Sequence, residues 1–151
     1  INQAAAVKVF MGASTGEMLV DSIDALDDIF HYSPLTVVTH CEDPQRVIDN
    51  EKLFFEKYGS DLSAQHHHLI RDVESCYLSS SLAVNLAKKY DANLHVFHLT
   101  TAKEMELFTS GAVDGKKITA EVCVHHMYFN ESDYAELGNQ IKCNPSIKQD
   151  R

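Results

Sequence analysis

Tryptophan, clustered cysteines and long apolar runs are all missing from this sequence of 151 residues. No apolar run approaches the roughly 18 residues that a membrane span requires, which argues against an integral membrane protein. The first ten residues lack the basic start and apolar core of a secretory signal, and they lack an initiator methionine. We therefore expect the true N-terminus of the protein to lie elsewhere.

Cysteine is present but sparse. The four cysteines form no CxxC pair and lack the dense spacing of a disulfide scaffold; they are Cys41, Cys76, Cys123 and Cys143. This pattern predicts reduced thiols in a cytoplasmic protein.

Positive charge is scarce too, with 13 basic against 22 acidic side chains and a net charge of −9. The pairs Lys88-Lys89 and Lys116-Lys117 are isolated and make no basic patch. A surface of this charge repels duplex nucleic acid, so we expect neither a nucleic acid nor a membrane as partner. The acidity itself is most simply explained by solubility.

The residues that are present predict an α/β fold. Short apolar runs rich in β-branched residues are typical of strands in a parallel sheet, and four occur, at residues 6–11, 35–41, 93–100 and 117–124. Helix-like stretches alternate with them, at residues 17–31, 44–58, 73–90 and 103–110. This alternation favours a single α/β domain. Residues 59–72 are the one segment that we expect to form a loop.

A lysine inside the first apolar run allows two interpretations. Lys8 is flanked by Val7 and Val9, so its stem should be buried, where an unpaired ammonium is costly. Either the ammonium pairs with a carboxylate, or it loses its proton because burial favours the neutral amine. A neutral amine reacts with carbon dioxide to give a carbamate, an oxygen ligand that is able to bridge two zinc ions. Spacing alone favours the salt bridge.

Histidine is abundant, with nine residues, and several lie near the ends of apolar runs. His40 and His98 each lie near the carboxyl end of a predicted strand, where active sites of α/β proteins gather. Each is either a hydrogen-bonded core residue or a metal ligand. The triplet at residues 66–68 lies in the predicted loop, so we expect solvent-exposed rings. Of the neighbours His125 and His126, at most one should point toward a shared site.

Five segments in succession carry a resemblance: VKVFMGAST, VVTHCED, HVFHLTTAKE, ITAEVCVHHMYF and IKCNPSIK. In this order, from Val7 to Lys148, the chain resembles the dihydroorotases of the amidohydrolase superfamily. The resemblance implies part of a (β/α)8 TIM barrel of the metal-dependent hydrolase type, which takes about 250 residues when complete. Residues 1–151 would be the central part of one barrel domain, about strands four to seven, with its flanking parts absent.

The resemblance also implies a binuclear zinc site and a reaction. Lys8 would be carboxylated and bridge the two zinc ions, and His40 and His98 would ligate one of them. The reaction would be the reversible cyclisation of N-carbamoyl-L-aspartate to L-dihydroorotate in pyrimidine biosynthesis.

Further residues follow from the resemblance. Asn144 would contact the pyrimidine ring, and Ser14 and Thr15 match a loop that closes over the substrate in some members. Glu121, with His125 and His126, would surround the site without touching metal.

Two parts of the family's site do not occur in the sequence. The His-x-His of the first strand and the general-base Asp of the eighth strand are both expected outside this span, so the span alone should be inactive. A substrate-binding arginine is expected outside it as well, and Arg71 should serve packing or a surface ion pair. We expect a small-molecule substrate and, because open sheet edges promote pairing, a homo-oligomer. The alternatives are an allantoinase, dihydropyrimidinase or hydantoinase, a non-catalytic dihydroorotase-like subunit, and a bare structural fragment.

Overall fold

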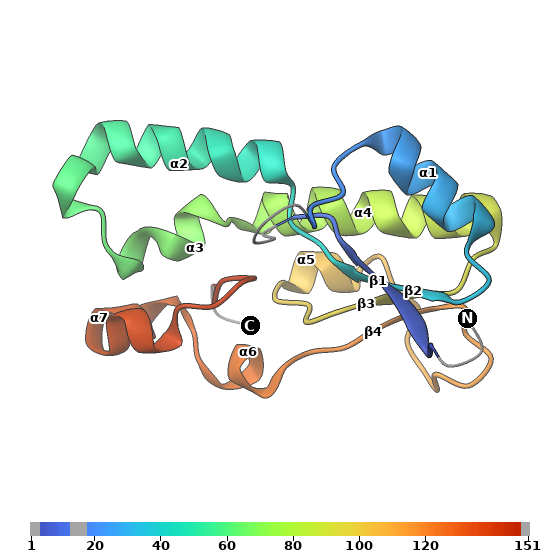
Figure 1. Cartoon of the computed structure of the whole chain (residues 1–151). Helices are drawn as coiled ribbons and strands as arrows, with labels where there is room; N and C mark the ends of the chain where they lie inside the picture. The colour runs from blue at the N-terminus through green and yellow to red at the C-terminus, as the bar shows by residue number, and fades with distance from the viewer. Residues whose placement is uncertain (1–3, 13–17, 149–151) are drawn as a thin grey trace.

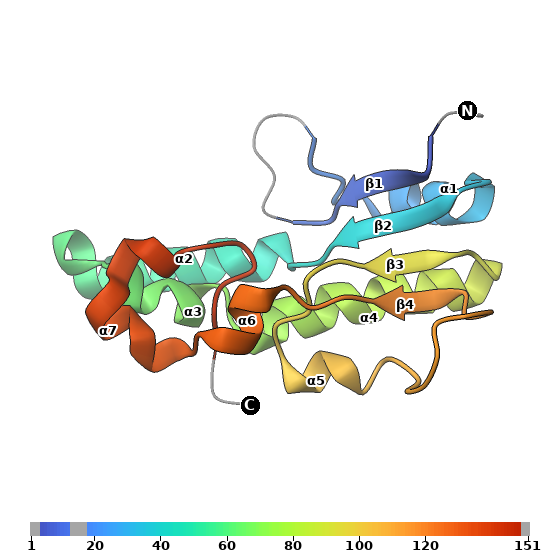
Figure 2. The ribbon, with the colours of Figure 1, turned by 90° about the horizontal axis from the view of Figure 1, so that it is seen from below.

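A parallel four-stranded sheet forms the centre of the protein (Figures 1 and 2). The structure, a computed structural model, describes residues 4–12 and 18–148. The strands follow one another in the sheet in chain order: β1 (Ala6–Phe10), β2 (Thr36–His40), β3 (Leu94–Val96) and β4 (Ile118–Ala120). All three pairings are parallel. The predicted α/β class with a parallel sheet is confirmed.

Within the described residues, seven α-helices connect or follow the strands: α1 (Ile23–Tyr32), α2 (Pro44–Tyr58), α3 (His67–Ile70), α4 (Val73–Tyr90), α5 (Ala102–Met105), α6 (Val124–Tyr128) and α7 (Tyr134–Leu137). The two longest each begin after an aspartate whose side chain caps the first turn. The Asp43 side chain accepts the backbone N–H of Arg46, with Pro44 in the first turn of α2. Asp72 caps α4 in the same way through Ser75.

Several predicted elements are shorter in the structure. The third run forms only Leu94–Val96, because the chain leaves the extended conformation at His98, whose φ is +43°. The stretch at residues 103–110 is helical only to Met105, and the first helix begins after the Ser22 cap. The expected loop at residues 59–72 contains α3 and two short 3-10 turns. That part of the prediction was wrong.

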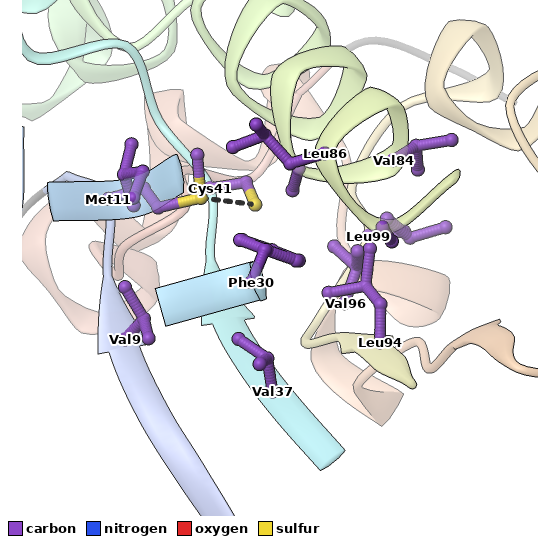
Figure 3. Close-up of a cluster of buried hydrophobic side chains, with 13 residues drawn as sticks. Val9, Met11, Phe30, Val37, Cys41, Val84, Leu86, Leu94, Val96 and Leu99 are labelled. Atoms are coloured by element: carbon purple, nitrogen blue, oxygen red, sulfur yellow. Dashed lines mark hydrogen bonds between the residues drawn. The ribbon is translucent and has the colours of Figure 1, made fainter. Parts of the chain in front are cut away.

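One face of the sheet is sealed by helices. Figure 2 shows the strands in front of α1 and α4, which cover the far face. Alternate strand residues point to these helices: Val9, Val37, Leu94 and Val96, each at most 2% exposed. Figure 3 shows them packed with Phe30 of α1 and with Val84 and Leu86 of α4. Burial of this apolar surface is the main term holding the sheet to its helices.

Beyond the carboxyl ends of the strands lie α6, α7 and the C-terminal segment (Figure 2). Their own core is small and consists of Tyr134, Ile141 and Ile147. A close backbone approach fixes the end of β1 at the same edge: a Cβ on Gly12 would lie 2.0 Å from the Glu42 carbonyl oxygen, so only glycine fits. Every described helix is too short or too polar to cross a lipid bilayer.

Candidate metal centre

The second face of the sheet carries the candidate metal ligands. Because side chains alternate along a strand, Lys8, Phe10 and His40 point away from the buried Val9 and Val37. Phe10 and His40 are register partners, and their ring centroids lie 6.2 Å apart. This face therefore carries a cationic, an aromatic and an imidazole side chain, with Val38 as the register partner of Lys8.

His98 reaches this face through an unusual backbone conformation. It is two residues from the buried Val96, so a continued strand would direct it toward the helices. Its φ of +43° breaks that alternation. A left-handed conformation costs a non-glycine residue about 1–3 kcal/mol, and such strain is concentrated at functional sites. Its result here is that the His98 ring lies beside that of His40.

The two imidazoles present ring nitrogens to each other. His40 Nδ1 lies 3.1 Å from His98 Nε2, and the ring planes are nearly perpendicular, at 74°. Two nitrogens bound to one tetrahedral zinc at about 2.0–2.1 Å would lie about 3.3 Å apart. Burial, followed by the nearby His40 and Lys8, lowers the pKa of His98 to about 3, so its ring is neutral near pH 7, as a metal ligand must be. The pair therefore fits a zinc ion in spacing and donor type.

A buried carboxylate orients the His40 ring. Glu42 Oε2 accepts a hydrogen bond from His40 Nε2 at 2.8 Å, and Arg71 Nη1 donates to the same oxygen at 2.8 Å. Burial would raise the pKa of Glu42, but the His40 hydrogen bond and the Arg71 charge outweigh it and hold that pKa below its usual value. The ionised Glu42 keeps the proton of His40 on Nε2. The lone pair of His40 is thereby left on Nδ1, toward His98.

Lys8 differs from the expectation of burial. It is exposed, because strand alternation directs it to the face that no described helix covers. Its amine lies over two aromatic rings, 4.1 Å from the centroid of Phe97 and 4.8 Å from that of Phe10. Desolvation lowers the Lys8 pKa, although Cys41 and Glu121 act in the opposite direction. No carboxylate of the described residues forms a salt bridge with it.

Asn144 lies apart from the histidine pair, at a cavity of about 1030 Å³ between α2, α3 and the C-terminal segment. His67 and Arg71 also line this cavity, whereas Lys8, His40 and His98 do not. His67 Nε2 lies 2.9 Å from the Cys143 carbonyl oxygen and 3.1 Å from Asn144 Oδ1. A carbonyl only accepts, so Nε2 carries the proton. Asn144 Oδ1 therefore also accepts from His67 Nε2, which leaves the Asn144 amide N–H groups to donate elsewhere.

Comparison with known proteins gives the context for this arrangement. A dihydroorotase of Carboxydothermus hydrogenoformans is 31% identical over 123 residues, which is 76% of this chain and 26% of that protein. An allantoinase of Streptomyces avermitilis is 25% identical over 113 residues, 75% of this chain and 24% of that protein. The chain is related to the cyclic amidohydrolases. No protein-family model matches it.

The fold of these amidohydrolases agrees with that of the chain. The crystal structure of a dihydropyrimidinase from Brevibacillus agri superposes with a TM-score of 0.83 at 16% identity, covering 96% of this chain and 32% of that one. The predicted resemblance to the dihydroorotases is confirmed. The chain spans about a quarter to a third of the length of the relatives that it matches.

The structure corrects two expectations about the segment before α4. None of the three adjacent histidines is fully exposed, and His67 is only 8% exposed because the C-terminal segment covers it. Arg71 pairs not at the surface but with the fully buried Glu42.

The remaining predicted residues are placed as follows. Glu121 Oε2 lies 3.3 Å from His95 Nε2. The Glu121 charge raises the pKa of Lys8, but the two side chains form no salt bridge. His125 and His126 lie in α6 rather than in a strand, with ring centroids 4.2 Å apart. Ser14 and Thr15 lie outside the described residues.

Sequence reasoning missed Glu42, His67 and Lys148 as parts of this region. Glu42 could have been found from its position two residues after His40, just beyond the carboxyl end of β2. Lys148 is 5% exposed and donates to Thr100 Oγ1 at 3.0 Å and to the Ser146 carbonyl at 3.2 Å. It links the C-terminal segment to the segment between β3 and α5, and no local sequence pattern predicts this contact.

Proposed function

We propose that these residues form part of a metal-dependent cyclic amidohydrolase of the dihydroorotase type, which interconverts N-carbamoyl-L-aspartate and L-dihydroorotate. The observation that carries the proposal is the 3.1 Å approach of His40 Nδ1 to His98 Nε2 at the strand ends. The relation to a dihydroorotase over 76% of the chain supports the substrate. We expect the whole to be a (β/α)8 barrel, with this chain supplying about its fourth to seventh strands.

His40, His98 and Lys8 would hold zinc, as two ions if Lys8 is carboxylated. The neutral amine of Lys8 attacks the carbon of carbon dioxide and loses a proton, which leaves a carbamate with two oxygen donors. The lowered pKa of Lys8 supports this step, since only the neutral amine is nucleophilic. Zinc bound there would act as a Lewis acid on the ring amide carbonyl.

The chain's own residues would prepare the site for that chemistry. Glu42 fixes the protonation of His40, and Arg71 keeps Glu42 ionised. Because His67 donates to Asn144 Oδ1, the Asn144 amide nitrogen points away from His67, and the Asn144 N–H groups can donate to a ring carbonyl. The general-base aspartate would come from another segment of the protein.

A substrate panel with the full-length protein tests this proposal. L-dihydroorotate, allantoin, dihydrouracil and hydantoin are each offered, with and without a chelator. We expect hydrolysis of dihydroorotate above the other three, its loss with the chelator, and its return on adding zinc. Asn144→Ala should raise the KM for dihydroorotate. Asn139 lines the same cavity but is not a hydrogen-bond partner of His67, so Asn139→Ala should not raise it.

An allantoinase is the second candidate, because the Streptomyces relative covers nearly the same share of the chain. Preferential hydrolysis of allantoin would replace the dihydroorotase assignment with this one. Failure of all four substrates with zinc bound would favour a non-catalytic subunit.

A further inference from the structure

A second group of metal-binding side chains lies at the turn from β4 into α6. Cys123, His125 and His126 each offer one donor atom, and these atoms all lie within 4.8 Å of one another. Cys123 is at the N-cap of α6, yet its side chain makes no capping hydrogen bond. The thiol is free and only partly buried, and His125 is exposed. The cluster is therefore accessible from solvent and has its sulfur uncommitted.

The His126 ring is held in the form that a metal ligand needs. Its Nε2 lies 3.0 Å from the Pro145 carbonyl oxygen, which only accepts, so Nε2 carries the proton. The lone pair is then on Nδ1, which is buried and has no hydrogen-bond partner among the described residues. A histidine that donates one ring N–H to a carbonyl and keeps the other nitrogen bare is the usual arrangement of a zinc ligand.

We propose that Cys123, His125 and His126 bind a zinc ion separate from the Lys8, His40 and His98 centre. One thiolate and two imidazoles form a donor set suited to zinc, and solvent would complete a tetrahedral site on the exposed side. The donors lie at most 4.8 Å apart and need only close to the spacing of about 3.3–3.8 Å expected around zinc, a movement within reach of side-chain rotation at an exposed helix start. All three ligands come from four consecutive residues, so the site does not depend on a distant segment.

Sulfur distinguishes this site from the candidate catalytic centre, whose donors are nitrogen and oxygen. The test uses the full-length protein with His40→Ala and His98→Ala, which removes the first pair of ligands. Cobalt(II) added to it should give the intense near-ultraviolet absorption of thiolate-to-cobalt charge transfer, and zinc should displace that signal. Cys123→Ser should abolish the band, and His126→Ala should weaken zinc binding at least about tenfold in competition with a chelating dye.

Cys143→Ser is the matched control. Its sulfur lies 3.8 Å from His126 Nε2, on the protonated side of the ring, so this variant should keep the charge-transfer band. Circular dichroism checks that each variant is folded. Absence of the band while Cys123 is present in folded protein would overturn the proposal, as would a band that survives Cys123→Ser. Neither result would affect the substrate assay, which tests the proposed catalytic function independently.

Discussion

The two faces of the central sheet use the same strands for different purposes. The face toward α1 and α4 is aliphatic and almost free of solvent exposure, with Val37, Leu94 and Val96 at 0%. The other face presents Lys8, His40 and aromatic rings, and its histidines are held by hydrogen bonds rather than by aliphatic packing. Stability should therefore depend mainly on one face and metal chemistry on the other, so substitutions on each face should have separable effects.

The largest effects, on zinc affinity and on stability, are expected when one residue on each face is substituted separately. His98→Asn keeps a side chain that tolerates positive φ but removes the imidazole, so zinc affinity and hydrolysis should fall at least about 100-fold. Measured without metal, its free energy of unfolding should change by less than about 1 kcal/mol, because the lost stabilisation by zinc then does not enter the value. Calorimetry and metal analysis of the full-length protein check both values.

Leu94→Ala is the counterpart on the helix-covered face. Removing a fully buried leucine should cost about 2–5 kcal/mol of stability in denaturant unfolding. The zinc content of each folded molecule should stay unchanged. Loss of zinc from folded Leu94→Ala, or retention of zinc by His98→Asn, would show that the two faces do not have separable roles.

Glu42→Gln should have an intermediate effect, because it acts through His40. Without the carboxylate, His40 is no longer held with its proton on Nε2, and zinc affinity should fall about 10–100-fold. Glu74→Gln is the control, since Glu74 forms a partly exposed ion pair with Lys103 and has no hydrogen bond to His40. Equal zinc affinities for the two variants would show that Glu42 does not orient His40.

Acid should destabilise the metal-free protein through its histidines. The pKa of His98 is lowered to about 3 and that of His126 to about 4, in both cases chiefly by burial. Unfolded histidines titrate near 6.5, so below about pH 6.5 the unfolded chain binds protons that the folded chain does not. The Tm measured in chelator should therefore fall between pH 7 and pH 5, and His98→Asn should reduce that fall. A Tm that is constant over this range would contradict these pKa values.

The smallest effect is expected from an ion pair at the amino end of β4. Lys117 pairs there with Asp91, and both side chains are at least half exposed. Solvent screens such a pair, so Lys117→Ala should change stability by less than about 1 kcal/mol. A larger loss of stability in thermal unfolding would show that the Lys117–Asp91 ion pair itself stabilises this edge of the sheet.

Much of the framework was predictable because its determinants are local. Asp43 followed by Pro44, and Asp72, mark the starts of α2 and α4. Apolar runs gave the four strands, and the strand ends drew attention to His40 and His98.

Other features depend on distant partners and were therefore not predictable. His67 is buried by a segment 76 residues away, and Arg71 meets Glu42 across 29 residues. The exposure of Lys8 depends on what covers the second face, which its own sequence neighbours do not specify. The positive φ of His98 likewise has no signature in the run that precedes it.

Anomalous diffraction at the zinc absorption edge, from crystals of the full-length protein, tests the central claim most directly. We predict a peak about 2.0–2.1 Å from both His40 Nδ1 and His98 Nε2, on the face of the sheet that bears Lys8. Zinc-loaded crystals that show no peak between these two nitrogens would contradict it.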